Sequence, residues 1–161
     1  DVGTGAGFPG MVLKIVQPDM DITLLDSLNK RIDFLSELCA RLKLENVQCV
    51  HVRAEEISEE RRAAYDIAVS RAVARLGTLC GLCLPYLRVG GLFIAMKGPD
   101  CAQEVKEAEN AMHLLGGRLK ETVHYSIPGT DISHAAVVIE KTKPTHPKYP
   151  RKWAQIKKQP L

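Results

Sequence analysis

Several features that mark other protein classes are missing from this sequence of 161 residues. No apolar run reaches the length of a membrane span and no signal-peptide pattern is present, so we expect no membrane association and a cytoplasmic location. Aromatic residues make up only 5% of the chain. Hydrophobic and charged residues, at 45% and 25%, are ordinary for a globular protein, and the length suits one domain with a full core.

Cysteine and metal-ligand patterns are also sparse. The five cysteines form an odd number without a regular framework, which argues against a secreted disulfide scaffold. Cys80 and Cys83 have C-x-x-C spacing, but no second pair of ligands at comparable spacing accompanies them, so we predict no zinc site. Because the two cysteines lie in a helix-like apolar stretch, we expect them to be buried. The histidines and the adjacent acids Glu55 and Glu56 show no metal-ligand spacing either, and we predict no metal site.

The chain opens on a glycine-rich stretch, Asp1-Val-Gly-Thr-Gly-Ala-Gly-Phe-Pro-Gly10, followed by an apolar run that predicts the first turns of a helix. Glycine lets backbone amides approach a ligand closely, and the positive end of a helix dipole favours a phosphate or a nucleotide there. The glycines at positions 3, 5 and 7 do not follow the G-x-G-x-x-G pattern of dinucleotide-binding proteins. An acid followed by three alternating glycines looks like the first motif of class I S-adenosylmethionine-dependent methyltransferases.

Asp26 ends a short apolar strand and lies 19 residues after Gly7. In a βαβ unit, an acid at the tip of the second strand can accept both ribose hydroxyls of a nucleoside. Asp26 or Ser27 could instead cap the helix that follows. These two roles are compatible, and the glycine loop, the strand and the acid together favour nucleoside binding.

Strand-like and helix-like segments alternate along the chain, which predicts a parallel sheet covered by helices on both faces. The last two strands are joined by a short turn instead of a helix, so we expect one antiparallel strand. Asp1 and Val2 should be the end of a central strand whose remainder is absent, and we interpret the sequence as a fragment. We expect helices at 9–16, 28–42, 76–87 and 102–115, and strands at 22–26, 47–52, 65–70, 90–96, 119–127 and 135–139.

Positive charge is concentrated at the C-terminal end. Residues 141–161 hold seven Lys and Arg and no acid, whereas residues 1–140 carry a net charge of −4. We therefore divide the chain into a domain, 1–140, and a basic tail, 141–161, and the tail suggests a polyanionic partner. The alternatives are a solvated terminus and a segment that docks back on the domain through Tyr149–Lys152.

Six segments together closely resemble the 16S ribosomal RNA methyltransferase G family, also called glucose-inhibited division protein B. They are the glycine-rich opening, Leu24-Leu-Asp-Ser-Leu-Asn-Lys-Arg31, Arg53-Ala-Glu-Glu-Ile57, Ser70-Arg-Ala72, Ala95-Met-Lys-Gly98 and Tyr149-Pro-Arg-Lys152. The resemblance implies an α/β class I methyltransferase (Rossmann-like) fold, doubly wound, with a mostly parallel sheet and one antiparallel strand near the C-terminus. It also implies S-adenosyl-L-methionine as cofactor, guanine N7 as methyl acceptor, and 16S ribosomal RNA or the 30S subunit as partner, with no obligate protein partner.

The resemblance further implies roles for individual residues. The cofactor would contact the glycine loop, the end of strand 22–26, the segment after strand 47–52 and the tip of strand 65–70. The residues concerned are Gly3, Gly5, Gly7, Phe8, Asp26, Ser27, Ala54, Glu55 and Arg71. Arg71 would also serve as the catalytic residue beside the target guanine, with a structural salt bridge as its alternative role. The RNA would contact Lys97, Lys148, Arg151 and Lys152, although Lys97 could be a solvated loop lysine.

Methylation at guanine N7 suits a site without a dedicated base. The N7 lone pair needs no deprotonation before it attacks a sulfonium methyl group, so catalysis can depend on positioning. The sequence lacks both the Asp/Asn-Pro-Pro-aromatic tetrad of amine methyltransferases and a Pro-Cys nucleophile for pyrimidine carbon. Two alternatives stay open: a small-molecule methyltransferase of the same fold, and a non-catalytic nucleotide-binding or RNA-binding module.

Overall fold

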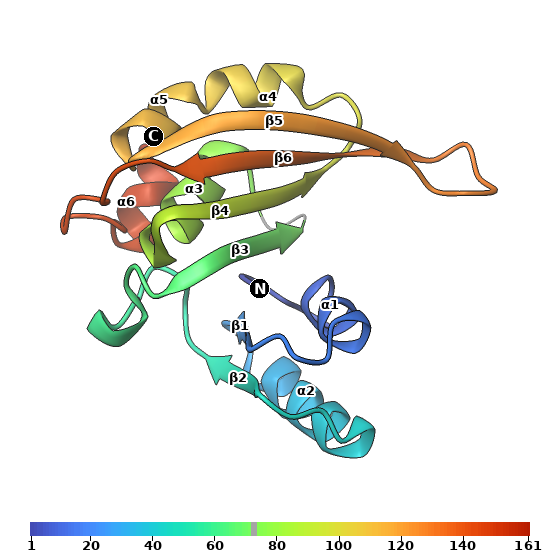
Figure 1. The fold of residues 1–161 in the computed structure, drawn as a ribbon. Helices are drawn as coiled ribbons and strands as arrows, with labels where there is room; N and C mark the ends of the chain where they lie inside the picture. The colour runs from blue at the N-terminus through green and yellow to red at the C-terminus, as the bar shows by residue number, and fades with distance from the viewer. Residues whose placement is uncertain (72–73) are drawn as a thin grey trace.

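The protein is described here by a computed structural model that covers residues 1–71 and 74–161. Ala72, the last residue of one of the segments quoted above, lies outside the described residues. The strands form a two-stranded parallel sheet, β1–β2, and a four-stranded sheet in the order β3-β4-β6-β5 (Figure 1). Their bounds are β1 Ile22–Asp26, β2 Val47–His51, β3 Tyr65–Arg71, β4 Leu87–Lys97, β5 Gly117–Ser126 and β6 Ser133–Lys141.

The antiparallel strand is β6. It runs antiparallel to both β4 and β5, whereas β3 and β4 are parallel. Because β5 and β6 are joined by a hairpin, no crossover helix is needed, and β6 can lie between β4 and β5. The prediction of a mostly parallel sheet with one antiparallel strand near the C-terminus is confirmed.

Asp1 and Val2 lie between β1 and β3, as the central-strand prediction requires. Val2 pairs in parallel with Leu25 of β1, and its N–H donates to the carbonyl of Val69 in β3 at 2.9 Å. The N–H of Leu25 donates to the carbonyl of Asp1 at 3.0 Å. Asp1 and Val2 therefore hydrogen-bond to both sheets, Asp1 to β1 and Val2 to β3. A cavity of about 1230 Å³ continues along the gap between these two strands, and the first residues of β1 and β3 line its walls.

The observed helices differ from the predicted ones at their ends, and one of them, Trp153–Lys158, lies in the predicted tail, where no helix was expected. They are α1 Gly10–Val16, α2 Asn29–Leu42, α3 Leu76–Cys83, α4 Ala102–Glu107, α5 Glu109–Leu114 and α6 Trp153–Lys158, with short 3₁₀ turns at Glu59–Arg61 and Leu84–Tyr86. The helix predicted to reach residue 87 ends at Cys83, because Pro85 has no N–H to continue the ladder, and Leu87 already begins β4. The predicted helix 102–115 is two short helices that meet at Ala108.

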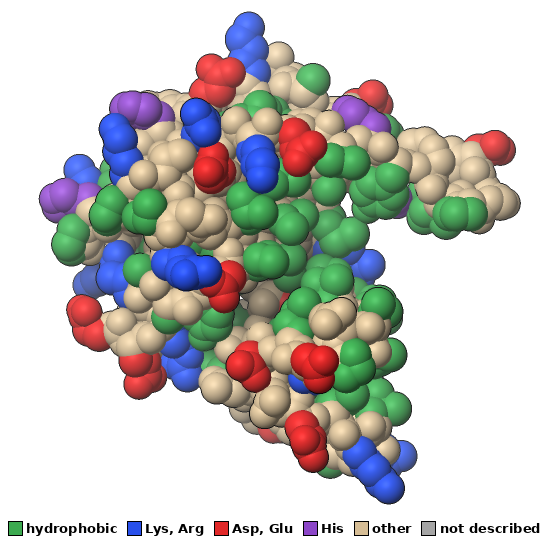
Figure 2. Space-filling view, in the orientation of Figure 1, with side chains coloured by type: hydrophobic (Ala, Val, Ile, Leu, Met, Phe, Trp, Pro, Cys, Tyr) green, Lys and Arg blue, Asp and Glu red, His purple; other side chains and the backbone are tan. Residues whose placement is uncertain are grey.

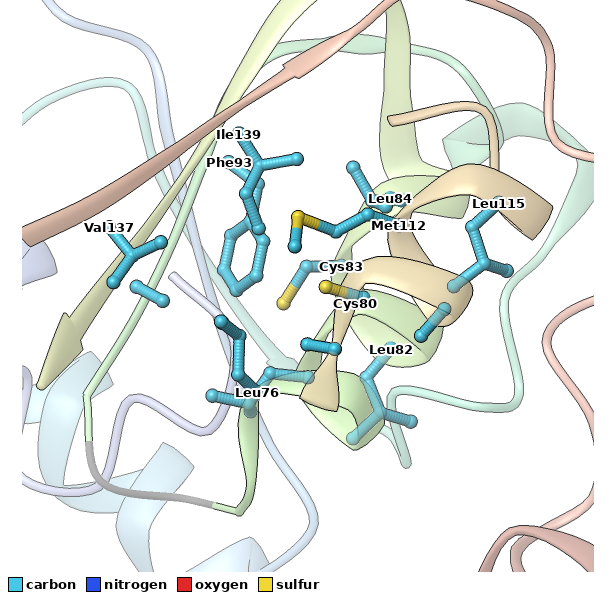
Figure 3. Close-up of a cluster of buried hydrophobic side chains, with 14 of the residues drawn as sticks. Leu76, Cys80, Leu82, Cys83, Leu84, Phe93, Met112, Leu115, Val137 and Ile139 are labelled. Carbon is cyan, nitrogen blue, oxygen red and sulfur yellow. The ribbon is translucent and has the colours of Figure 1, made fainter. Parts of the chain in front are cut away.

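The chain has two apolar cores, one for each sheet. In the smaller one α2 buries Ile32, Leu35 and Cys39 against β1, but Leu42, which continues the same stripe in the sequence, is 47% exposed at the end of the helix. In the larger core the thiols of Cys80 and Cys83 lie among Phe93, Met112 and other apolar side chains of α3, α5 and the four-stranded sheet (Figure 3).

Both cysteines of the C-x-x-C pair are fully buried, so their prediction as packing residues is confirmed. Burial raises the pKa of the Cys80 thiol to about 12 and raises the pKa of Cys83 as well. A thiol that stays protonated is neither a nucleophile nor a metal ligand. Within residues 1–71 and 74–161 there is no group of three or more His, Cys, Asp or Glu side chains placed to hold a metal ion.

The segment predicted to be a basic tail packs against the domain. Tyr149 and Ile156 are only 6% and 5% exposed and belong to the larger core. The guanidinium of Arg62 donates to the carbonyl of Tyr149. Lys141 is also buried, and its ammonium donates to the carbonyls of Leu84 and Leu115 at 2.7 and 3.0 Å. The burial of Tyr149 agrees with the alternative in which Tyr149–Lys152 docks back, but the ion pair with an acid that this alternative expects for Arg151 is not found among the described residues. No helix of the described residues is both long and apolar enough to cross a membrane.

Candidate active site

The glycine loop runs from the end of the central strand into α1, and its glycines have different surroundings. Gly5 and Gly7 both have positive φ, at 60° and 95°. A Cβ at Gly7 would lie 2.4 Å from Cγ of Met11, so the absence of a side chain there lets the loop pack on its own helix. A Cβ at Gly5 would meet no atom within 4 Å. Gly5 thus faces open space that a ligand can occupy.

Asp26 is 2% exposed and is tied to both the loop and the next helix. Its Oδ2 accepts the backbone N–H of Gly5 at 2.9 Å, and its Oδ1 accepts the N–H of Leu28 at 2.9 Å. The guanidinium of Arg31 lies 3.1 Å from Oδ2. The bond to Leu28 closes the turn before α2 and caps no amide of the helix, and α2 has no side-chain cap from Asp26 or Ser27. Binding of ribose by the same carboxylate, with Ser27 beside it, stays a prediction.

The segment after β2 lies beside Asp26, because the register pairs Asp26 with His51. The imidazole Nε2 of His51 is 3.1 Å from the carbonyl oxygen of Ser27. Farther along, the carbonyl of Ala54 accepts the Tyr86 hydroxyl at 3.0 Å, and the carboxylate of Glu55 is 8% exposed and lies 3.8 Å from Arg53. His51 thus lies next to the acid at the end of β1, whereas Ala54 contacts Tyr86, which directly precedes β4. Adenine contact by Ala54 and Glu55 stays a prediction.

Arg71, at the last position of β3, packs over the ring of Phe8, with 5.2 Å between Cζ and the ring centroid. Phe8 is 46% exposed, so one residue of the glycine loop and the predicted catalytic arginine meet at the surface. The ion pairs found among the described residues do not include Arg71, so the structural salt bridge considered as its alternative is not seen there.

Asp1 is a candidate site residue that the sequence analysis did not assign. Its Oδ2 accepts the Thr4 hydroxyl and the Gly10 N–H, both at 2.8 Å. Its Oδ1 is the buried side-chain polar atom without a hydrogen-bond partner among the described residues. A buried carboxylate oxygen without a donor fits a ligand with a positively charged group, as S-adenosylmethionine has. The position of Asp1 at the head of the glycine motif was the available signal.

Arg31 was missed as well, although it closes one of the segments that carry the family resemblance. Its pairing with Asp26 spans five residues, from the tip of a strand into the first turn of α2, and no helical periodicity connects the two. The pair could not be predicted from the sequence, because it depends on the conformation of the turn between β1 and α2. Arg31 is 51% exposed, so water partly screens its ion pair with the buried Asp26.

The β5–β6 hairpin overhangs this end of the sheet. Lys97, the last residue of β4, pairs with Ala135, and the hairpin continues beyond it. Figure 2 shows apolar side chains on the projecting hairpin and on the α1 region below it, with a notch between them. The exposed apolar residues are Tyr125, Ile127 and Ile132 on the hairpin and Val12, Ile15 and Val16 on α1.

The four lysines and arginines predicted to contact RNA do not come together. Lys97 is 10% exposed, and its ammonium bonds the Ala74 carbonyl and the Glu104 carboxylate, each at 2.8 Å. Lys148, Arg151 and Lys152 flank Tyr149, which contacts Arg62 just before β3 begins, whereas Arg71 ends that strand. A strand of this length spans roughly 20 Å. RNA contact by these four residues stays a prediction.

The sheet order with its one antiparallel strand, and a glycine loop leading into the first helix, define a class I methyltransferase fold. Solved structures agree. The chain superposes on a geranyl diphosphate C-methyltransferase from Streptomyces coelicolor with a TM-score of 0.66 and 12% identity, covering 88% of this chain and 71% of that one. For an rRNA methylase from Streptococcus thermophilus the TM-score is 0.59 at 16% identity, with 87% and 83% covered. At such identities the likeness concerns the fold alone.

Sequence comparison narrows the class to one family. Residues 1–132 match the family model described as rRNA small subunit methyltransferase G (GidB). The chain is 52% identical over 163 aligned residues to the ribosomal RNA small subunit methyltransferase G of Clostridium tetani, covering all of this chain and 68% of that protein. The protein of the same name from Alkaliphilus oremlandii matches at 52% with the same coverage. The chain belongs to the rRNA small subunit methyltransferase G family, which confirms the resemblance found in the sequence.

Proposed function

We propose that this chain transfers a methyl group from S-adenosyl-L-methionine to the N7 of a guanine in small-subunit (16S) ribosomal RNA. The observation that carries the proposal is the identity of about half of all residues to rRNA small subunit methyltransferases G over the whole chain. That similarity favours this activity over a small-molecule methyltransferase and over a non-catalytic binding module.

The cofactor supplies an electrophilic methyl group on its sulfonium. Three parts of the chain would hold it. Asp26 would accept the ribose hydroxyls, and the segment with Ala54 and Glu55 would border the adenine. The open face of Gly5 and the unpaired Oδ1 of Asp1 would receive the methionine portion, where the buried oxygen would accept its ammonium group.

Arg71 and Phe8 would orient the acceptor. A guanidinium is planar, always charged and able to donate two parallel hydrogen bonds, so Arg71 can grip either a carboxylate or a phosphate. Its stacking on Phe8 fixes the direction of the fork. Guanine N7 presents its lone pair without loss of a proton, so the residues need only align the two reactants and keep water away.

The substrate would reach the site from the edge where β3 and β4 end. The notch between α1 and the hairpin has apolar rims, which suit an unstacked base. Lys148, Arg151 and Lys152 would contact phosphates of the same RNA away from the reaction centre. A cytoplasmic location follows if the substrate is 16S RNA, as free RNA or in the 30S subunit.

Methyl transfer with labelled S-adenosylmethionine tests the proposal. Naked 16S RNA and intact 30S subunits lacking the modification are incubated with the protein, and the methylated base is mapped by mass spectrometry. We expect label in one guanine, at N7. Label in another base, or none in either substrate while S-adenosylhomocysteine still binds, would contradict the proposal.

A further inference from the structure

Two residues outside the predicted cofactor site, Lys97 and Glu104, hold the backbone of the segment 74–76 at Ala74 and Leu76. Lys97 lies at the end of β4, beside Arg71, because the register pairs Arg71 with Met96. Its ammonium donates to the carbonyl of Ala74 and to Oε1 of Glu104 in α4, each at 2.8 Å. The same Oε1 accepts the backbone N–H of Leu76 at 2.5 Å. One carboxylate and one ammonium thus bind the segment at both Ala74 and Leu76.

These contacts join the segment to rigid parts of the fold. Leu76 is fully buried in the larger core and begins α3, where the first amides lack partners within the helix. Arg75, the residue before α3, provides no side-chain cap, so Glu104 does this from another helix. Lys97 is 10% and Glu104 24% exposed, so water competes weakly for either group.

A second acid of α4 lies nearby and offers a comparison. Glu107 pairs with Arg75 at 2.8 Å, but both side chains are exposed, at 46% and 77%. Exposed pairs of this kind contribute little to stability. Glu107 therefore shares the helix, the charge and the neighbourhood of Glu104 but not its contact with the backbone of the segment.

We propose that the Lys97–Glu104 pair positions Arg71 for methyl transfer, because Lys97 follows the strand residue that pairs with Arg71 and, together with Glu104, fixes the start of α3 at Ala74 and Leu76. Lys97 is then a positioning residue and not a contact for RNA phosphate, since the Ala74 carbonyl and Glu104 occupy two of its three N–H groups. The proposal rests on the role of Arg71 in the function proposed above.

The test compares Glu104→Ala, Lys97→Met, the double variant and the matched control Glu107→Ala. We expect Glu104→Ala and Lys97→Met each to lower kcat on 16S RNA by about tenfold or more, since small displacements of a positioning group cost that much. The double variant should be no slower than the worse single one, and Lys97→Arg should recover part of the loss. The dissociation constant for S-adenosylhomocysteine should stay unchanged in all of them, and Glu107→Ala should match the wild type.

A phosphate contact by Lys97 would give another pattern. Lys97→Met would then weaken RNA binding and flatten its salt dependence, while Glu104→Ala would leave RNA binding unchanged or tighten it. That result overturns the proposal, and so does wild-type kcat in both single variants.

Amide hydrogen exchange provides a readout that needs no activity. Exchange at the Leu76 amide should accelerate in Glu104→Ala and not in Glu107→Ala, in the protein without ligands. Equal exchange at the Leu76 amide in the two variants overturns the proposal that Glu104 fixes this backbone, even where methyl transfer is lost. Absence of methyl transfer in the wild type, with accelerated exchange in Glu104→Ala, contradicts the proposed function but still supports the role of Glu104 in fixing the backbone at Leu76.

Discussion

The carboxylate of Asp26 accepts a hydrogen bond from the backbone amide of Gly5, with 2.9 Å between Oδ2 and N. The acid at the tip of β1 therefore fixes the glycine loop. If Asp26 also accepts the ribose hydroxyls, as proposed above, a change at Asp26 acts on the cofactor in two ways, through the lost acceptor and through the loosened loop.

Replacement of Asp26 by alanine should weaken S-adenosylmethionine binding by more than tenfold. A hydrogen bond to a charged group contributes roughly 1.5–3 kcal/mol, and the variant also leaves the Gly5 and Leu28 amides without their acceptor. We expect a lower melting temperature in addition. Calorimetry with S-adenosylhomocysteine measures the affinity, and Arg31→Met, which removes only the half-exposed ion pair, is the control for the loss of charge. Unchanged affinity in Asp26→Ala would remove this residue from the site.

Gly5→Ala and Gly7→Ala should separate ligand contact from packing. Both glycines have positive φ, so the backbone cost of alanine, roughly 1–2 kcal/mol, is similar for the two. The methyl group at Gly7 collides with Met11, whereas the one at Gly5 enters open space. We expect the larger loss of thermal stability at Gly7 and the larger loss of S-adenosylhomocysteine affinity, relative to stability, at Gly5. Gly5→Val should abolish binding while circular dichroism still shows a folded domain. The reverse ranking in the alanine pair would mean that Gly5 has a structural role only.

Arg71→Lys should greatly reduce methyl transfer with little change in melting temperature. Lysine keeps the positive charge but lacks the planar fork and stacks less well on Phe8. Because Arg71 is exposed at the end of β3 and shares no ion pair within the described part of the chain, its replacement should not disturb packing. Single-turnover methylation of 16S RNA gives the rate, and turnover near that of the wild type would exclude a catalytic role.

The sequence predicted the βα alternation well, because each strand is an apolar run bounded by polar or glycine residues. β1 was predicted with its observed bounds, and β2 and β3 differ by one residue each. The ends of β4 and α3 were wrong. An apolar stretch through Leu87 has no periodicity to separate a buried helix from a buried strand, and only Pro85 marked the change.

Local motifs located the glycine loop, Asp26 and Arg71, since each follows directly from a strand end. Lys97 shows the limit of such reasoning. Its partners, Ala74 and Glu104, are distant in sequence and meet it only when β4, α4 and the start of α3 are packed together. A lysine at a strand tip has the same sequence pattern whether it faces solvent, RNA or a carboxylate, so its burial could not be predicted.

Lys141 should make the free energy of unfolding depend on pH in the alkaline range. Burial, with a smaller effect of Arg62, lowers the pKa of its ammonium from 10.5 to about 8. Between these values the unfolded chain binds more protons than the folded one, so the free energy of unfolding contributed by this group rises as pH rises from 8 to 10.5. The difference in unfolding free energy between wild type and Lys141→Met should therefore grow over that range, since buried thiols titrate alike in both. A constant difference for Lys141→Met would show that its folded pKa is not lowered.

Substitutions of the exposed C-terminal cations and of the buried Tyr149 should have different effects. Lys152 is exposed and Arg151 partly exposed, whereas Tyr149 is buried against Arg62. If the cations bind RNA phosphates, reversing the charge of Arg151 and Lys152 should flatten the slope of log affinity against log salt by roughly one unit per lost contact. The melting temperature and S-adenosylmethionine affinity should then change little. Tyr149→Ala should do the opposite, with a stability loss of about 3–5 kcal/mol and an unchanged salt slope in the fraction that folds. Should the double reversal instead lower the melting temperature and leave the slope where it was, residues 149–152 serve to close the fold and the RNA contacts lie elsewhere.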